Sequence, residues 1–133
     1  MLLLSDVTVL LIEDDGNFRR VIAGVLRDSG AVVHDHPSGE AAVEFAQMHA
    51  GAIDLLLTDT NLPGMNGLCA AETIRMLHPE LPVIQMSGNP RDSQLARSIG
   101  GPTIRFLSKP FLAGAFNEAL REALGSRARS VAA

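Results

Sequence analysis

The chain has 133 residues, of which 47% are hydrophobic and 20% charged, which suits one globular domain with a full core. Its formal net charge of −4 gives no attraction to nucleic acid or to an anionic membrane, because such partners usually require a basic patch. The single cysteine permits no internal disulfide.

Short apolar runs alternate along the chain with longer segments of helical period. The first run, 7–12, is followed by a stripe of Phe18, Val21, Ile22, Val25 and Leu26 at helical spacing, which Gly30 can end. Further strands are expected at 31–33, 53–57, 83–86 and 103–107. Further helices are expected at 38–50, 66–77, 91–99 and 112–124. The order is therefore strand then helix, repeated five times.

This alternation predicts an α/β fold with a five-stranded parallel sheet, doubly wound, with helices on both faces. Three of the runs are continuously apolar, as strands covered on both faces should be. We expect one domain at 1–126. Because the ending GSRARSVAA is small and polar, we expect 127–133 to be a flexible C-terminal tail or the start of a linker.

Polar residues with related chemistry follow four of the expected strands. These residues are Glu13, Asp14 and Asp15 after the first, Asp59 after the third, Ser87 after the fourth, and Lys109 and Pro110 after the fifth. Because all parallel strands end at one edge of the sheet, these side chains should share a crevice there. Crowded carboxylates repel one another unless a cation joins them, and hard oxygen ligands suit Mg²⁺.

The motifs at these positions resemble the receiver domain of two-component response regulators. They are the pair Glu13-Asp14, the segment LLLTDTNLPGMNGL around Asp59, PVIQMSG with Ser87, and FLSKPF with Lys109. They come in the order and at the spacing of that family, and the resemblance extends from about residue 7 to residue 124. It implies a flavodoxin-like receiver fold with strand order 2-1-3-4-5, an order that the periodicity does not supply.

The resemblance assigns a role to each acidic residue. Asp59 is implied to be the phosphoacceptor, which takes a phosphoryl group from a phosphohistidine or a small acyl phosphate. Asp14 is implied to bind Mg²⁺ directly and Glu13 through water, with Asp59 itself and the main-chain carbonyl of Asn61 as further ligands. Asn61 is also implied, with Asn89, to tune dephosphorylation, because the two asparagines flank the route by which water arrives.

The remaining implied roles belong to the last two strands. Ser87 and Lys109 are implied to bind the phosphoryl oxygens, and the Lys109–Pro110 peptide bond is implied to be cis. Phe106, three residues before the lysine, is either a core aromatic or the aromatic residue of the family's conformational switch. The chain departs from the family here, because Phe106 replaces a tyrosine or histidine and Ser87 replaces the commoner threonine.

Structural interpretations of the same residues remain open. The acids at 13–15 could simply begin a helix, Asp59 precedes turn-forming residues, and Ser87 and Lys109 could merely end strands. Two other functions are also open: a receiver fold that binds partners without being phosphorylated, and an aspartate-dependent phosphohydrolase. The second is disfavoured because Asn61 stands where such an enzyme needs a second acid.

Partners follow from the resemblance. We expect a histidine kinase or histidine phosphotransfer protein to dock against Asn17, Phe18 and the 110–111 loop. A homodimer through helix four, strand five and helix five is possible, whereas no nucleic acid or membrane partner is expected.

Since no apolar run approaches ~20 residues and the opening MLLLSD lacks the basic flank of a signal peptide, we expect a cytoplasmic location. The pattern resembles receivers of hybrid kinases and phosphorelay proteins, so the chain is either a stand-alone receiver or a module of a larger protein.

Three other residues receive structural interpretations. Cys69, beside Ala70 on an expected helix, is predicted to pack in the core. His34 and His36 share one strand face, but no third ligand has suitable spacing, so we expect no metal site there.

Overall fold

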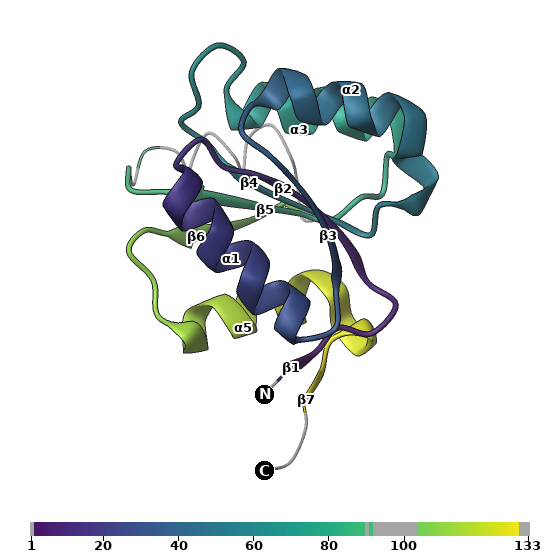
Figure 1. Ribbon diagram of the computed structural model, residues 1–133, viewed down its shortest axis with the longest axis vertical. Coiled ribbons are helices and arrows are strands. Elements are labelled where there is room, and N and C mark those ends of the chain that lie inside the picture. The colour runs from purple at the N-terminus through teal and green to yellow at the C-terminus, as the bar shows by residue number, and fades with distance from the viewer. Residues whose placement is uncertain (1, 90, 92–103, 131–133) are drawn as a thin grey trace.

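Figure 1 shows the protein as a computed structural model that describes residues 2–89, 91 and 104–130. A five-stranded parallel sheet crosses its centre. The strands are β2 (Thr8–Ile12), β3 (Val32–His36), β4 (Leu55–Asp59), β5 (Val83–Ser87) and β6 (Ile104–Ser108). Their order in space is β3-β2-β4-β5-β6, which confirms the predicted order 2-1-3-4-5 for these five strands.

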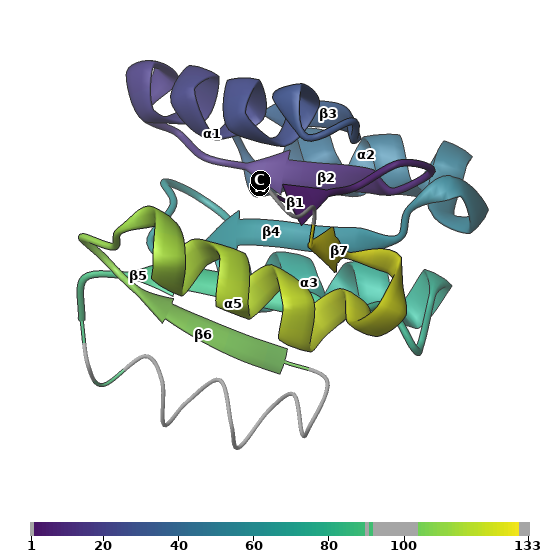
Figure 2. The ribbon, with the colours of Figure 1, turned by 90° about the horizontal axis from the view of Figure 1, so that it is seen from below.

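Helices cover both faces of the sheet, as the alternation of strands and helices predicts (Figures 1 and 2). One face carries α1 (Gly16–Asp28) and α5 (Ala113–Leu124), and the other carries α2 (Gly39–His49) and α3 (Gly67–Leu77). The 3-10 turns η1 (Ala50–Ala52) and η3 (Gly125–Arg127) follow α2 and α5. The helix predicted at 91–99 lies outside the described residues except for Arg91, and so does most of the helix-four part of the predicted dimer face.

The apolar strands explain why the core has two halves. Successive side chains of a strand point to opposite faces, so Val9 and Leu11 of β2 pack toward α1 and α5, while Leu10 and Ile12 pack toward α2 and α3. All five residues of β4 are buried. The sheet is therefore held between two separate hydrophobic layers.

Local signals set the ends of α1. The Asp15 carboxylate accepts hydrogen bonds from the main-chain N–H groups of Asn17 and Phe18, as a helix N-cap does. The helix buries Ile22, Ala23 and Leu26. Past its end, Gly30 adopts a φ of 99°, a left-handed conformation that glycine takes without strain. The chain then turns back into β3.

Two strands of the sheet differ from the predicted ranges by more than one residue at an end. β3 continues through the polar residues His34, Asp35 and His36, because it is an edge strand whose side chains meet solvent as well as core. β4 begins at Leu55 and includes Asp59, so the expected strand at 53–57 was placed two residues too early. Ile53 is buried but precedes the strand, and its apolar side chain extended the predicted run toward it.

The prediction that Cys69 packs in the core is wrong. Cys69 is exposed, whereas its neighbours Leu68, Ala70 and Ala71 are buried. The helix turns about 100° per residue, so an exposed position can lie between buried ones. Cys69 occupies the solvent side of α3.

The two histidines of β3 share a face, and both lie against the ring of Phe45, at centroid distances of 4.6 and 5.2 Å. His49 stacks on the same ring at 4.4 Å. Among the described residues, the group able to hold a metal ion does not include these histidines.

The two ends of the chain meet in a short antiparallel ribbon that the sequence did not reveal. β1 (Leu2–Leu3) pairs with β7 (Arg129–Ser130), and Leu2 and Leu4 are buried in the core beneath α1 and α5. Arg127 bonds to the carboxylate of Asp54 at 2.8 Å. Part of the expected tail at 127–133 therefore lies on the body of the domain. No helix among the described residues is long and apolar enough to cross a membrane.

Candidate functional site

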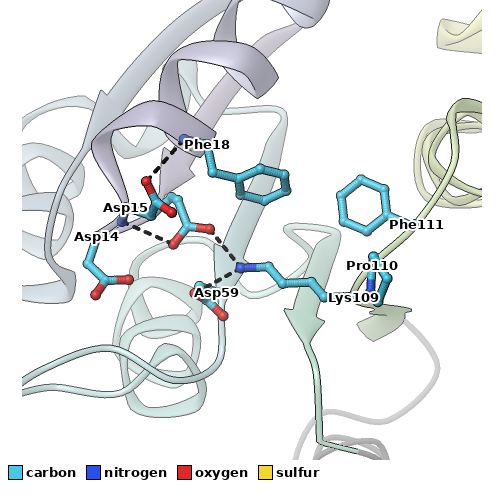
Figure 3. Close-up of a pocket in the computed structure, with 8 residues that line it drawn as sticks. Asp14, Asp15, Phe18, Asp59, Lys109, Pro110 and Phe111 are labelled. Atoms are coloured by element: carbon cyan, nitrogen blue, oxygen red, sulfur yellow. Dashed lines mark hydrogen bonds and ion pairs between the residues drawn. The ribbon is translucent and has the colours of Figure 1, made fainter.

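The carboxyl ends of the strands form one cleft, as the parallel arrangement requires. Figure 3 shows this cleft, whose volume is about 530 Å³. β2 leads into Glu13 and Asp14, β4 ends at Asp59, and β6 leads into Lys109. The lining residues are Glu13, Asp14, Asp15, Phe18, Asp59, Lys109, Pro110 and Phe111.

Lys109, the only lysine of the chain, joins two of these carboxylates. Its Nζ lies 2.7 Å from Oε1 of Glu13 and 3.1 Å from Oδ2 of Asp59 (Figure 3). Burial by itself lowers the pKa of Lys109, but the hydrogen bonds and charges of Glu13 and Asp59 outweigh burial and hold that pKa above its usual value. The Lys109–Pro110 peptide bond that follows is cis.

Glu13 is the most enclosed of the acids, with an exposed fraction of 1%. Burial raises the pKa of its carboxyl, Lys109 opposes that shift, and the nearby Asp59 adds to it. The main chain of Glu13 is held as well, because the Arg19 guanidinium donates to its carbonyl at 2.8 Å. Glu13 is thus fixed by the fold, and the interpretation as a helix start fits Asp15 instead.

Three carboxylates lie close enough to share one cation. Ligand oxygens of Glu13, Asp14 and Asp59 all lie within 4.8 Å of one another. Glu13 and Asp59 are buried, whereas Asp14 is exposed. Carboxylate oxygens are hard donors of the kind that Mg²⁺ takes, and they outnumber the one ammonium among them. The donor set therefore fits a divalent cation, with Asp14 open to solvent.

Ser87 ends β5 beside this cleft, but it is not among the lining residues. Its side chain is buried, and its Oγ accepts a hydrogen bond from the main-chain N–H of Asn89 at 3.0 Å. The main-chain N–H of Lys109 donates to the Ser87 carbonyl at 2.8 Å. The structure therefore connects the serine and the lysine through the backbone of adjacent strands.

The other predicted site residues lie around these. Asn61 and Asn89 are exposed on the loops that follow β4 and β5. Phe106 lies in the middle of β6, half-buried, beside Gln85 in the register of the sheet.

Aromatic side chains form one wall of the cleft (Figure 3). Lys109 Nζ lies 4.7 Å from the centroid of the Phe18 ring, within the range of a cation–π contact. Phe18 in turn meets Phe111 edge to face at 5.9 Å, and Phe111 stacks near Phe116 at 5.6 Å. The sequence predicts only a docking role for Phe18, whereas in the structure its ring also contacts the lysine.

Two features of the site were missed from the sequence. The contact between Lys109 and Glu13 joins residues 96 positions apart, and nothing local signals it. Gln85, by contrast, had a signal: it is the one polar residue inside the run VIQM of a strand that is buried along its whole length. Its side-chain amide bonds to Thr60 and Gly67.

Comparison with known proteins identifies the class. Residues 9–121 match the family model described as the response regulator receiver domain. The chain therefore belongs to the receiver-domain family and is a receiver domain of two-component signalling. Its structure resembles that of a response regulator receiver protein from Sinorhizobium medicae, with a TM-score of 0.80 and 30% identity over 91% of this chain and 96% of that one. The receiver domain from the hybrid histidine kinase CckA gives a TM-score of 0.75 and 30% identity, over 88% of this chain and 98% of that one.

Curated relatives differ in what accompanies this domain. The sensor kinase CckA of Brucella abortus is 31% identical over 107 residues, which cover 80% of this chain and 11% of the kinase. The transcriptional regulator CtrA of Caulobacter vibrioides is 31% identical over 103 residues, which cover 77% of this chain and 44% of the regulator. The chemotaxis protein CheY of Pseudomonas aeruginosa is 26% identical over 116 residues, which cover 86% of this chain and 93% of that protein. The chain spans less than half the length of the first two.

Proposed function

We propose that this receiver domain accepts a phosphoryl group on Asp59 in a Mg²⁺-dependent reaction and changes its surface in response. The observation that carries the proposal is the convergence of Asp59, the Glu13–Asp14 pair and Lys109 in one cleft. A purely structural lysine at a strand end would not need two buried carboxylates within 3.1 Å.

The chain supplies the nucleophile and the groups that receive charge. An Asp59 carboxylate oxygen attacks the phosphorus of a phosphohistidine, the P–N bond breaks, and the imidazole nitrogen keeps the electron pair and takes a proton. Lys109, already at Asp59, follows the new negative charge onto the phosphoryl oxygens, and the Ser87 hydroxyl donates to another of them. Glu13, Asp14, Asp59 and the main-chain carbonyl of Asn61 would hold Mg²⁺, which would neutralise charge on the transferred group.

The cleft also limits the direction of approach. Asp59 lies inside the cleft, with Phe18 and Phe111 on one wall. A phosphohistidine must reach Asp59 in line, so its protein should dock over the start of α1, at Asn17 and Phe18, and over the 110–111 loop. The relatives named as sensor kinase and hybrid histidine kinase support a histidine kinase or histidine phosphotransfer protein as this partner. A cytoplasmic location agrees with such a partner.

The response is proposed to follow the inward movement of the Ser87 hydroxyl. Phe106 then turns toward the space behind Ser87, and the surface of β6 and α5 changes. A phenylalanine lacks the polar tip that could favour the inward state by a hydrogen bond, so we expect a modest population shift. Exposed Asn61 and Asn89 can orient water but cannot deprotonate it, which suits moderate self-dephosphorylation. The domain would catalyse only two reactions, its own phosphorylation and its own dephosphorylation.

The experiment is phosphorylation with acetyl phosphate and Mg²⁺, read by intact-protein mass and by amide chemical shifts with beryllofluoride. Wild type should gain one phosphoryl group and show shifts at Asp59, Ser87 and Phe106. Asp59→Asn should gain none, while Glu44→Gln, which removes an exposed carboxylate of α2 outside the cleft, should behave as wild type. Phosphorylation that persists in Asp59→Asn would refute the proposal. A correctly folded wild-type protein that gains no phosphoryl group would also refute it.

A further inference from the structure

A buried polar network lies under the loop that follows Asp59. Gln85 of β5 has an exposed fraction of 0% and Thr60 one of 4%. The Thr60 hydroxyl donates to Oε1 of Gln85 at 2.8 Å, and Nε2 of Gln85 donates to the Gly67 carbonyl at 3.1 Å. One side-chain amide therefore bonds both ends of the loop from Thr60 to Gly67.

The backbone closes the loop at the same two residues. The N–H of Gly67 donates to the Thr60 carbonyl, and the N–H of Thr60 donates to the Met86 carbonyl of β5, both at 2.9 Å. A side chain at Gly67 would collide with the main-chain oxygen of Asp59, so α3 can approach the strand end this closely only with glycine there. Small movements of this junction therefore displace the backbone next to Asp59.

Packing alone does not explain an amide at this position. The rest of β5 is apolar up to its terminal Ser87, and a methionine would fill a similar volume without the cost of burying an amide. An amide carries a donor and an acceptor in one rigid plane, so it fixes the start and the end of the loop relative to each other. The segment between these ends carries Asn61, whose main-chain oxygen is a proposed ligand of the cation.

We propose that Gln85 is a positioning residue of the phosphorylation site: its two hydrogen bonds fix the 60–67 loop, and with it the main-chain oxygen of Asn61, relative to Asp59. Gln85 itself does not line the cleft, so it acts through Thr60 and Gly67. This inference rests on the proposed function, because it concerns the geometry that Mg²⁺ binding requires.

The test compares variants that break the network with one that destabilises the same strand elsewhere. Gln85→Met removes both hydrogen bonds, Thr60→Val removes one at nearly constant volume, and Thr60→Ser keeps the hydroxyl. Ile84→Val is the matched control, because Ile84 is buried in the layer on the opposite face of β5. Each protein is measured for unfolding in urea, for amide chemical shifts at residues 61–67 without metal, and for Mg²⁺ affinity by titration.

Gln85→Met and Thr60→Val should shift the amide signals of the metal-free loop and weaken Mg²⁺ binding about tenfold, as is usual when a residue that orients a metal ligand is lost. The double variant Gln85→Met/Thr60→Val should bind Mg²⁺ no more weakly than Gln85→Met alone, because both changes break the same network. Thr60→Ser should bind as wild type does. Ile84→Val should lose stability without losing affinity.

Two results would overturn the inference: Mg²⁺ affinity that stays unchanged in Gln85→Met and Thr60→Val, or affinity that falls with stability in Ile84→Val as well. If Gln85→Met does not fold, the pair Thr60→Val and Thr60→Ser decides the matter by the same measurements. Failure of the proposed function looks different, because wild type itself would then bind no Mg²⁺ and gain no phosphoryl group, and both proposals would fall together.

Discussion

Glu13 depends on Lys109 for its charge partner within the cleft. Its carboxylate is 1% exposed, and Lys109 Nζ lies 2.7 Å away. A buried ion pair adds little net stability, but removal of one member leaves the other charge buried and uncompensated. The Lys109 ammonium therefore holds the carboxylates together. We expect its loss to affect folding as well as phosphorylation.

We expect Lys109→Met to lower the free energy of unfolding of the metal-free protein by about 1–3 kcal/mol, a range below that of fully buried pairs because the lysine side chain is 25% exposed. The double variant Lys109→Met/Glu13→Gln should be more stable than Lys109→Met, because the more deeply buried of the two orphaned carboxylates is then replaced by a neutral amide. Urea unfolding at pH 7 measures both. A double variant that is no more stable than Lys109→Met would contradict this account of the pair.

Asp14 and Glu13 should contribute unequally to Mg²⁺ affinity. Asp14 is exposed and close to Asp59, whereas the Glu13 oxygen is occupied by Lys109. We therefore expect Asp14→Ala to weaken Mg²⁺ binding more than Glu13→Gln does, as measured by calorimetric titration with Glu44→Gln as an exposed control on α2. Equal losses, or none, would show that the pair does not bind metal as proposed.

At the scale of elements, Asp35 ties α1 to the edge strand β3. Its carboxylate bonds to Arg19 at 3.2 Å and to Arg27 at 3.1 Å, and both arginines lie on α1. Burial by itself raises the pKa of Asp35, but the two arginines outweigh burial and hold that pKa below its usual value. We call these two ion pairs the Asp35 staple. Arg19 also donates to the Glu13 carbonyl, so the staple connects α1 to the cleft.

Asp35→Asn should lower the free energy of unfolding by about 0.5–1 kcal/mol at pH 7, because the pairs are only partly buried. Because the pKa of Asp35 is lower in the folded protein than its unfolded value of 3.8, the ionised carboxylate stabilises the fold fully above pH 3.8. This stabilisation is lost as the pH falls through the pKa of Asp35 in the folded protein. The difference between variant and wild type should therefore shrink below pH 3.8. Urea unfolding at pH 7 and pH 3 tests this, with exposed Glu72→Gln on α3 as the control; a difference that does not change with pH would argue against the staple.

At the scale of the whole molecule, the β1–β7 ribbon joins the two ends of the chain at the end of the sheet away from the cleft (Figure 1). Leu2 and Leu4 extend the core layer beneath α1 and α5. The bond between Arg127 and Asp54 holds the returning chain beside the start of β4. The first described residues thus belong to the folded body.

Leu2→Ala should lower the free energy of unfolding by about 2–3 kcal/mol, since a buried leucine is truncated. Met48→Ala, at a side chain that is 79% exposed, should change it by less than about 0.5 kcal/mol. Thermal or urea unfolding distinguishes them. If Leu2→Ala is as harmless as Met48→Ala, the ribbon does not contribute to the core.

Much of the fold could be predicted because its signals are local. Continuous apolar runs marked buried parallel strands, and the helical stripes placed both ends of α2, α3 and α5 within one residue. β3 was cut short because an edge strand with polar side chains carries no such signal. The β1–β7 ribbon was missed because two-residue strands have no periodicity, and only their meeting in space reveals them.

The sequence by itself determined the kind of fold and which residue types lie at the carboxyl edge, because alternating strands and helices with polar strand ends depend only on order along the chain. Tertiary structure alone decided which of these residues touch. Lys109 meets Glu13 more closely than Asp59, and Gln85 joins Thr60 to Gly67. These contacts join residues from 18 to 96 positions apart. Their geometry depends on sheet register and helix packing, which no local pattern encodes.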